Sequence, residues 1–469
     1  MELLDTPHMI ESISRQAAIP FDECLRVLWG CGHELHGRKF DLDAIRAILA
    51  ALDNPERRYP TAIVAGTNGK GSTSAMLAAI LERAGCRTGL YTSPHLIRVN
   101  ERIRVSGQEI SDDEFSAAFT TVHQAVEKLI KAGVLPYRPS FFEYLTAVAF
   151  EHFAHASIDF AVLEVGMGGR LDATNVTEAS VAVITNVDLD HQEFLGNTLT
   201  AIAAEKAGVI KPGRPVVSGC EHPEAREVIR QKCQEAGVEL IETRGLDAAH
   251  NLSHLDGRYS FNLQLDALQL SGISLQMPGE FQVKNAVTAA AAAWQLARAG
   301  FPITPESIRR GLRSAAWPGR LEVIRQRPPI LLDGAHNPAA AREVAQFVRR
   351  HYEGRTLRLV YASMRDKAIG EISNILFPLA QAVYLTRPGL DRAALPEAIR
   401  ESAAARPGQT IIEPDPVRAL ELAVCSSSPE DVVLVAGSLF LVGAVKRAIF
   451  EGRLVPEKLA PQELLSERR

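Results

Sequence analysis

The chain has 469 residues, of which 46% are hydrophobic and 23% are charged, and its formal net charge is −5 at pH 7. This length predicts two or three domains, and the composition is that of a globular protein with sizeable cores. The negative charge argues against a chain built to neutralise nucleic-acid phosphates. No apolar run approaches the roughly 18 residues of a membrane span, and the first residues lack the features of a signal peptide. We therefore expect a cytoplasmic protein with neither a membrane nor a nucleic-acid partner.

Strand and helix patterns alternate along the first two thirds of the chain, after short helices and loops up to about residue 58. Strands are expected at residues 61–64, 87–91, 159–165, 180–184 and 215–217. Helices are expected at residues 111–131, 142–152, 199–207, 281–298 and 305–313. Residues 259–277 alternate with period two, which predicts antiparallel strands appended to this domain. The alternation elsewhere predicts an α/β fold with a parallel sheet covered by helices.

A second α/β series follows the segment Trp317, Pro318, Gly319 and Arg320, where proline and glycine together interrupt the pattern. We expect domains at residues 1–317 and 318–469. Strands of the smaller second domain are expected at residues 329–332, 356–361, 382–385, 410–412 and 432–435. The charged residues from about 456 onward are expected to fray. The six scattered cysteines contain no C-x-x-C pair, so neither a zinc site nor a disulfide framework is predicted.

A glycine-rich turn at residues 65–73 joins the first strand to a helical pattern that begins near Ser72. Backbone N–H groups in such a turn, together with the helix N-terminus, form a phosphate cradle, and Lys70 would reach the β- and γ-phosphates. The match to G-x-x-x-x-G-K-[ST] is imperfect, because its first glycine would fall at Val64 and Gly71 replaces the hydroxyl residue. The alternative is a tight strand-to-helix connection without a ligand.

Polar residues follow three strands of the same predicted sheet. Ser93, Glu164 and His191 each lie near the carboxyl end of a strand, where open α/β sheets bind ligands. A carboxylate and a hydroxyl there suit a magnesium ion, although magnesium prefers oxygen to histidine nitrogen. The alternatives are an ordinary Ser-Pro turn, a solvated glutamate in a glycine-rich loop and a structural histidine.

The first strand of the second domain is followed by Asp333, His336, Asn337 and Pro338. Helix capping accounts for Asn337 and for proline at the first helical position. It does not account for Asp333 and His336, which we expect on the side of the ligand crevice. Lys206, near the end of a helix, has the pattern of a surface lysine that interacts with the helix dipole.

Taken together, these segments resemble the folylpolyglutamate synthase and dihydrofolate synthase family of the Mur ligase superfamily. The matching segments, in family order, are residues 66–72, 91–96, 101–102, 142–143, 163–175, 190–191, 194–196, 205–208, 317–320, 333–338 and 437–438. The resemblance implies a P-loop-containing, Mur-ligase-type central domain and a smaller Rossmann-like C-terminal domain. It also implies an ATP-dependent amide ligase that phosphorylates a carboxylate of dihydropteroate or folate. The amino group of L-glutamate would then attack the acyl phosphate.

The resemblance implies residue roles as well. The phosphates of ATP would be held by Thr67, Asn68, Gly69 and Lys70, and further nucleotide contacts would come from Asn285, Arg320 and Asp333. Two magnesium ions would be bound, one by Ser93 and Glu164 and the other by His191 with a carbamylated Lys206, and a monovalent cation would also be compatible. The catalytic set would be Lys70, Glu164, His191 and Lys206. The pterin substrate would contact Ser140, Leu171, Asp172 and Ala173. The implied enzyme is a monomer.

One segment departs from the family, which often has a histidine after the Pro-Gly that precedes Asn285. Here Glu280 and Phe281 follow Gly279, while Gln282 and Asn285 keep their spacing. Three alternatives remain: folylpolyglutamate synthesis only, a cell-wall Mur ligase, and a nucleotide-dependent switch. The segment before the turn is too short and too helical for the extra domain of a cell-wall ligase.

Overall fold

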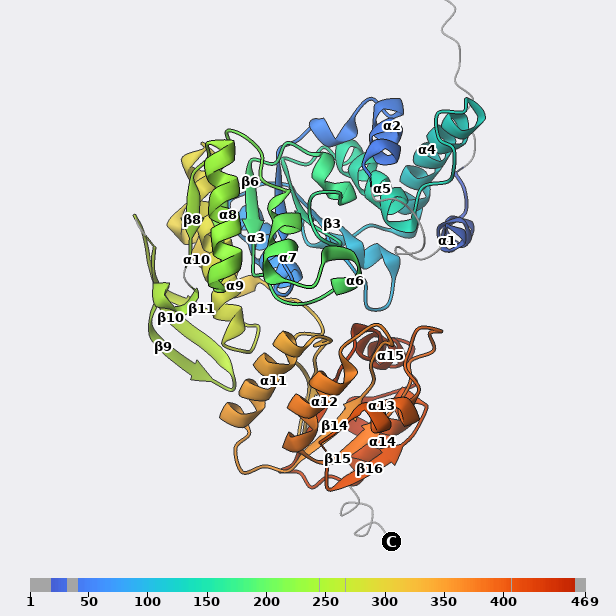
Figure 1. Ribbon diagram of the computed structural model, residues 1–469, viewed down its shortest axis with the longest axis vertical. Coiled ribbons are helices and arrows are strands. Elements are labelled where there is room, and N and C mark those ends of the chain that lie inside the picture. Colours follow the sequence, from blue (N-terminus) through green and yellow to red (C-terminus); the bar gives the residue numbers. More distant parts are fainter. Residues whose placement is uncertain (1–17, 32–40, 244, 266, 406, 460–469) are drawn as a thin grey trace, which may run out of the picture.

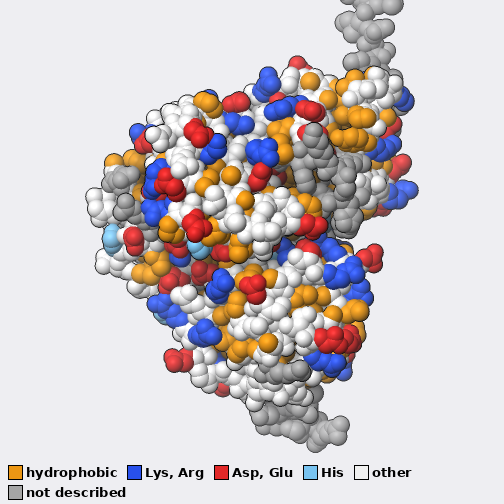
Figure 2. All heavy atoms as spheres, viewed as in Figure 1, with side chains coloured by type: hydrophobic (Ala, Val, Ile, Leu, Met, Phe, Trp, Pro, Cys, Tyr) orange, Lys and Arg blue, Asp and Glu red, His pale blue; other side chains and the backbone are white. Residues whose placement is uncertain are grey.

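The computed structural model describes residues 18–31, 41–243, 245–265, 267–405 and 407–459. Most of the segment expected to fray lies outside these residues. The chain forms two α/β domains stacked along the long axis of the molecule, with the second, orange to red in Figure 1, below the first. None of the helices in the described ranges is long and apolar enough to cross a membrane. On the face shown in Figure 2, acidic and basic side chains are interspersed over both domains.

An eight-stranded sheet forms the centre of the first domain, in the order β4-β3-β2-β5-β1-β6-β7-β8. Its strands are β1 (Thr61–Ala65), β2 (Thr88–Tyr91), β3 (Ile103–Val105), β4 (Gln108–Glu109), β5 (Phe160–Glu164), β6 (Val181–Ile184), β7 (Val216–Ser218) and β8 (Leu240–Glu242). All pairings are parallel except those of β3 and β4 at one edge. Every residue of β1 and β5 is buried, as expected for central strands covered on both faces.

Helices cover both faces of this sheet. On one face lie α1 (Phe21–Gly30), α2 (Asp43–Ala51), α4 (Asp112–Lys131), α5 (Phe141–His155), α6 (Gln192–Leu195), α7 (Leu199–Ala207) and α8 (Pro223–Ala236). On the other lie α3 (Lys70–Arg83), α9 (Phe281–Arg298) and α10 (Pro305–Ser314). The alternation of β1 shows this division, because Ala62 and Val64 pack toward α3 and α9 whereas Ile63 and Ala65 pack toward α7 and α8.

The appended antiparallel unit has three strands, β9 (Ala249–Leu255), β10 (Arg258–Leu265) and β11 (Leu268–Ser274), in the order β11-β10-β9. The prediction of antiparallel strands here is confirmed, although β9 was not predicted. Phe261 and Leu263 of β10 pack into the core shared with α9 and α10. The unit is therefore part of the first domain and reaches down beside the second (Figure 1).

The second domain contains a six-stranded sheet in the order β12-β13-β17-β14-β15-β16. Its strands are β12 (Glu322–Gln326), β13 (Pro329–Leu332), β14 (Leu357–Tyr361), β15 (Ala380–Leu385), β16 (Gln409–Ile412) and β17 (Val432–Ala436). One face is covered by α11 (Pro338–His351), α12 (Ile369–Leu376) and α13 (Pro396–Ser402), and the other by α14 (Pro416–Cys425) and α15 (Leu439–Phe450). Only β12 is antiparallel, and helices cover both faces, so the expected α/β, Rossmann-like second domain is confirmed.

We propose the boundary between the domains at Trp317 and Pro318. Trp317 packs against the core of the first domain, whereas Leu321 belongs to the core of the second. The change of core within four residues supports this position.

Candidate active site

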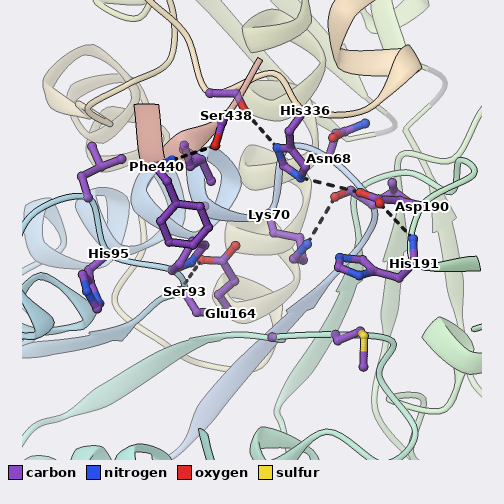
Figure 3. Close-up of a pocket in the computed structure, with 18 of the residues that line it drawn as sticks. Asn68, Lys70, Ser93, His95, Glu164, Asp190, His191, His336, Ser438 and Phe440 are labelled. Atoms are coloured by element: carbon purple, nitrogen blue, oxygen red, sulfur yellow. Dashed lines mark hydrogen bonds and ion pairs between the residues drawn. The ribbon is translucent and has the colours of Figure 1, made fainter. Parts of the chain in front are cut away.

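A cleft of about 1600 Å³ lies between the two domains. The first domain lines it with the segments that follow β1, β2, β5 and β6, and the second with those that follow β13, β14, β15 and β17. These are the carboxyl ends of parallel strands, the edge at which open α/β sheets bind ligands. The two ligand edges therefore face each other across one cleft (Figure 3).

The glycine-rich turn has the geometry of an anion cradle. Gly69 has φ +81°, and a Cβ at this residue would lie 2.4 Å from Asn285 Oδ1. The helix begins at Lys70, two residues earlier than expected. Because the first N–H groups of a helix have no partner within it, those at the start of α3 point out of the turn and are available to an anion. A Cβ at Gly71 would lie 2.6 Å from Trp317 Nε1. The indole of Trp317 thus explains why this turn has glycine where other P-loops have a hydroxyl residue.

The start of the turn is braced by the segment after β6. The backbone N–H groups of Thr67 and Asn68 donate to Asn186 Oδ1 over 3.2 and 2.8 Å, and Thr67 Oγ1 donates to the carbonyl of Asp188 over 3.1 Å. These two N–H groups already have a partner. The free donors for a phosphate therefore lie later in the turn, from Gly69 onward.

Two lysines converge on the turn. Lys70 Nζ donates to the carbonyl oxygens of Gly66 and Thr67 over 3.1 and 3.3 Å, and burial lowers its pKa despite the opposing charges of Glu164 and Asp190. Lys206 is 3% exposed, and its Nζ donates to the carbonyl of Gly66 over 2.9 Å. The expectation of a surface lysine at this position is wrong, because the end of α7 packs against the turn.

Burial, together with the charge of the nearby Lys70, lowers the pKa of Lys206 to about 7. A lysine with this pKa is partly neutral near physiological pH, whereas an ordinary lysine is almost wholly protonated. The neutral amine is the form that can react with carbon dioxide. The environment therefore suits the carbamate that the resemblance implies.

Glu164 and Ser93 lie together because β5 and β2 are neighbours in the sheet. Glu164 is 4% exposed, and its Oε2 accepts a hydrogen bond from the backbone N–H of Ser93 over 3.1 Å. Burial raises the pKa of Glu164, while Lys70 and this hydrogen bond oppose the rise. A buried carboxylate beside a hydroxyl provides oxygen ligands for a hard cation.

His191 lies across the turn from Glu164, with Lys70 between them (Figure 3). Burial lowers the pKa of His191 to about 4, with a further contribution from Lys367. The imidazole is therefore neutral near pH 7 and has a lone pair available to a metal. In the described part of the chain, no three His, Cys, Asp or Glu side chains come together as a metal cluster. Mg²⁺ that is bound together with substrate phosphates usually has only one or two ligands from the protein, so this arrangement is compatible with such ions.

Asp190 connects the two sides of the cleft, which sequence reasoning did not predict. Its carboxylate lies 2.7 Å from Lys367 Nζ, 3.0 Å from Asn337 Nδ2 and 3.7 Å from His336 Nε2, all from the second domain. Burial alone would raise the pKa of Asp190, but His336 and Lys367 hold it well below its usual range. Asn337 also donates to Asn68 Oδ1 over 2.9 Å. Asp190 and Asn337 thus link the segment after β6 and the glycine-rich turn to the second domain.

The predicted residues of the second domain lie at the cleft. Asp333 is 3% exposed, and its carboxylate accepts hydrogen bonds from the N–H groups of Leu321 and Ala335, each over 2.8 Å. Arg320 is near enough to lower the pKa of Asp333, although burial dominates and raises it. Asn337 caps α11 by accepting from the N–H of Ala340 over 2.9 Å, as predicted.

The segment that departs from the family builds a contact between the domains. Glu280 forms an ion pair with Arg350 of α11, and Phe281 packs against the core of the second domain. Asn285 donates to Gln282 Oε1 over 3.0 Å and lies beside Gly69. The altered residues therefore face α11, while Asn285 keeps its place at the turn.

The residues predicted for the pterin substrate lie along the cleft, but two of them also have structural roles. The hydroxyl of Ser140 caps α5 by accepting from the N–H of Glu143 over 3.2 Å. The carboxylate of Asp172 accepts from the N–H groups of Met167 and Thr174, each over 3.0 Å. Leu171 and Ala173 line the same wall.

An aromatic pair, which sequence reasoning did not predict, continues this wall. The ring of Trp29 stacks on Phe141 with centroids 5.1 Å apart and planes 18° apart. Trp29 nevertheless remains 56% exposed. The cleft thus has a flat apolar wall beside its charged centre.

Comparisons with known proteins agree with this geometry. Residues 64–293 match the Mur ligase middle domain, and residues 319–439 match the glutamate ligase domain of Mur ligases. A dihydrofolate synthase/folylpolyglutamate synthase of Bacillus subtilis is 33% identical over 423 residues, which covers 90% of this chain and 97% of that protein. The chain belongs to the folylpolyglutamate synthase and dihydrofolate synthase family. It is therefore an ATP-dependent ligase, as the sequence predicts.

Solved structures of this family have the same two-domain fold. E. coli FolC in complex with DHPP and ADP is similar with a TM-score of 0.82 and 32% identity, over 94% of this chain and 100% of that chain. The bifunctional folylpolyglutamate synthase/dihydrofolate synthase of Yersinia pestis, complexed with AMPPNP and Mn ion, has a TM-score of 0.80 and 32% identity, over 93% of this chain and 100% of that chain. The predicted fold class is thus confirmed.

Proposed function

We propose that this ligase is bifunctional and joins L-glutamate both to dihydropteroate and to the glutamyl end of folates. One observation carries the proposal: the proposed phosphate-binding edge of the first domain faces a second polar edge, with Asp333 and His336, across a single cleft. A nucleotide-dependent switch needs only the first edge. The flat apolar wall with Trp29 beside the charged centre supports a substrate that has an aromatic part and a carboxylate.

For the nucleotide, we propose that the turn from Thr67 to Lys70 holds the phosphates of ATP, with the N–H groups from Gly69 onward as donors. Asn285, Arg320 and Asp333 complete the nucleotide site from three further elements. Their placement around the turn supports this assignment.

Two magnesium ions fit the donor groups of the cleft. Ser93 and Glu164 hold one, and His191 holds the other with Lys206 once its amine has become a carbamate. A magnesium ion in such a site neutralises the charge between phosphate and carboxylate. A cationic Lys206 would repel that ion, whereas a carbamate offers an anionic oxygen.

The chemistry follows from charge. The carboxylate of the substrate attacks the γ-phosphorus of ATP, and ADP leaves with the electron pair of the broken phosphorus–oxygen bond. Lys70 stabilises the charge that develops in this step. The amino group of L-glutamate then attacks the acyl carbon, forms the amide and releases phosphate. The contacts of Asp190 with the second domain close the cleft, which orients the reactants and excludes the water that would hydrolyse the acyl phosphate.

On the substrate side, Ser140, Leu171, Asp172 and Ala173 line the pterin site together with the stacked Trp29. We further propose that the protein acts as a monomer in the cytoplasm, since both edges of the cleft come from one chain.

The test supplies the purified protein with ATP, L-glutamate and either dihydropteroate or tetrahydrofolate, and measures ADP and the glutamylated product by mass spectrometry. Product with both acceptors supports the proposal. Product with tetrahydrofolate alone would reduce it to folylpolyglutamate synthesis, and ADP formation without a glutamylated product from either acceptor would refute it.

A further inference from the structure

Arg392 lies in the loop that follows β15, at the ligand edge of the second domain, and lines the cleft. Its backbone carbonyl accepts from the N–H of Arg365 over 3.0 Å, and Ala393 forms a β-bridge with Met364. These bonds hold Arg392 beside the loop after β14, the loop that also contains Lys367. Its backbone position is thus fixed by the loop after β14.

The guanidinium of Arg392 has an unusual environment. Its Cζ lies 4.9 Å from the ring centroid of Phe440, a side chain of α15 that points into the cleft (Figure 3). Its Nε is buried and has no hydrogen-bond partner among the described residues. No carboxylate of the described chain forms an ion pair with it, whereas Lys367 is paired with Asp190 at 2.7 Å. A guanidinium that lines a ligand cleft and has no carboxylate partner within the protein is available to an anionic ligand.

We propose that Arg392 binds one carboxylate of the incoming L-glutamate and is a specificity-determining residue of the ligase. The inference rests on the proposed function. Glutamate brings two carboxylates toward an acyl phosphate that is itself anionic, so it needs cations on the side from which it approaches. A planar guanidinium, fixed on an aromatic ring, can bind a carboxylate with two parallel hydrogen bonds.

The position of Arg392 in the cleft indicates that it binds free glutamate and not the glutamyl tail of a folate. The residues proposed for the acceptor substrate, such as Ser140 and Ala173, lie on the first domain, whereas Arg392 lies on the second. An amine held by the second domain approaches the acyl carbon from the wall of the cleft that faces these residues. The carboxylates of free glutamate are therefore the ones that face Arg392.

The experiment compares Arg392→Met with the wild type in steady-state assays, with dihydropteroate as an acceptor that has no glutamyl tail. We expect the KM for L-glutamate to rise about 10- to 100-fold, as for a lost charge-assisted hydrogen bond, with the KM for ATP unchanged. In a second assay, hydroxylamine replaces glutamate and traps the acyl phosphate as a hydroxamate. The rate of this trapping should stay at the wild-type value, because it needs no glutamate site.

Two further variants and a control separate binding from folding. Arg392→Lys keeps the charge and should recover part of the affinity for glutamate, and Phe440→Leu keeps the arginine but removes its platform, so it should raise the KM by a smaller factor. Arg387→Met is the matched control: Arg387 lies in the same loop and also has a buried, unpartnered Nε, but it does not line the cleft. Its KM for glutamate should be that of the wild type.

Several results would overturn the assignment. An unchanged KM for glutamate in soluble, folded Arg392→Met would do so. A raised KM for tetrahydrofolate with an unchanged KM for glutamate would assign Arg392 to the glutamyl tail instead. An equal fall in hydroxamate trapping would show general damage to the site. If the wild-type protein itself has no ligase activity and forms no hydroxamate, the proposed function is refuted. That result is distinct from a failure of Arg392→Met alone.

Discussion

Replacing Lys206 with methionine should stabilise the fold while it abolishes ligation. The pKa of this buried amine is lowered from 10.5 to about 7, first by burial and then by Lys70. The pKa of Lys206 is thus about 3.5 lower in the folded state than in the unfolded state. This difference corresponds to about 5 kcal/mol of destabilisation of the fold when the amine is protonated in both states. Lys206→Met removes this penalty, at the loss of about 1 kcal/mol from the hydrogen bond to Gly66.

The sign of the pH dependence follows from proton binding. Between pH 7 and pH 10.5 the unfolded chain binds a proton at Lys206 that the folded chain does not, so the stability of the wild type rises with pH by about 1.4 kcal/mol per unit. The difference in unfolding free energy between Lys206→Met and the wild type should therefore shrink by the same amount for each pH unit. Urea titrations at pH 7, 8 and 9 in buffer free of carbon dioxide measure this slope. Lys232, exposed on α8, provides the control Lys232→Met, for which the difference should not depend on pH.

The activity of the same protein tests the carbamate. With a pKa of about 7, the neutral fraction of Lys206 rises from about one tenth at pH 6 to about nine tenths at pH 8. Bicarbonate added to enzyme depleted of carbon dioxide should therefore restore activity more fully at pH 8 than at pH 6, and intact mass spectrometry should show one added carbon dioxide. Full activity of Lys206→Met, or a stability difference without a pH slope, would refute the reasoning.

Three other predictions concern the cleft. Asp190→Asn leaves Lys367 buried without its counter-charge, which should lower the stability of the closed arrangement of the two domains by about 3–5 kcal/mol. The ligation rate should therefore fall steeply, and the double variant with Lys367→Met should be no slower than the single one. Glu280→Gln should weaken the partly exposed pair with Arg350 by 1 kcal/mol or less, measured as the coupling in a double-mutant cycle of urea unfolding. Ser140→Ala should lose about 1 kcal/mol of stability as a helix cap, like Ser111→Ala on α4. Only Ser140→Ala should also raise the KM for dihydropteroate, and equal KM values for the two variants would remove Ser140 from the substrate site.

The central elements of the fold were predictable because buried strands and helices have apolar residues in recognisable runs or periods. The apolar runs of β1 and β5 predicted these strands to within a residue or two, and α7 and α9 have the predicted ends. The missed strands β3, β4, β8, β9 and β12 lie at a sheet edge or next to one. They are partly or mostly exposed, so they have no apolar run or clear alternation. The missed helix α8 buries only Ala225, Ile229 and Cys233, too narrow a stripe to stand out among its charges.

The site was predictable only where position in the sheet determines it. Ser93 and Glu164 were singled out because they lie at the carboxyl ends of predicted parallel strands, and the structure brings them together because these strands are neighbours. Lys206 could not be placed from local pattern, since its burial depends on a hydrogen bond to Gly66, 140 residues earlier. The pairing of Asp190 with Lys367 likewise spans 177 residues and two domains. Contacts of this kind are set by tertiary packing alone.

The connection between the domains explains why nucleotide binding and ligation belong to one cleft. Asn68 lies in the nucleotide turn, and its side chain exchanges two hydrogen bonds with Asn337, over 3.2 and 2.9 Å. Asn337 is also the cap of α11, and it shares Asp190 with Lys367. The glycine-rich turn is thus joined through Asn337 to α11 and, through Asp190 and Lys367, to the loop after β14 that bonds to the backbone of Arg392. On the proposed function, these contacts hold the nucleotide side and the glutamate side of the cleft in one arrangement, in which the amine is oriented toward the acyl carbon.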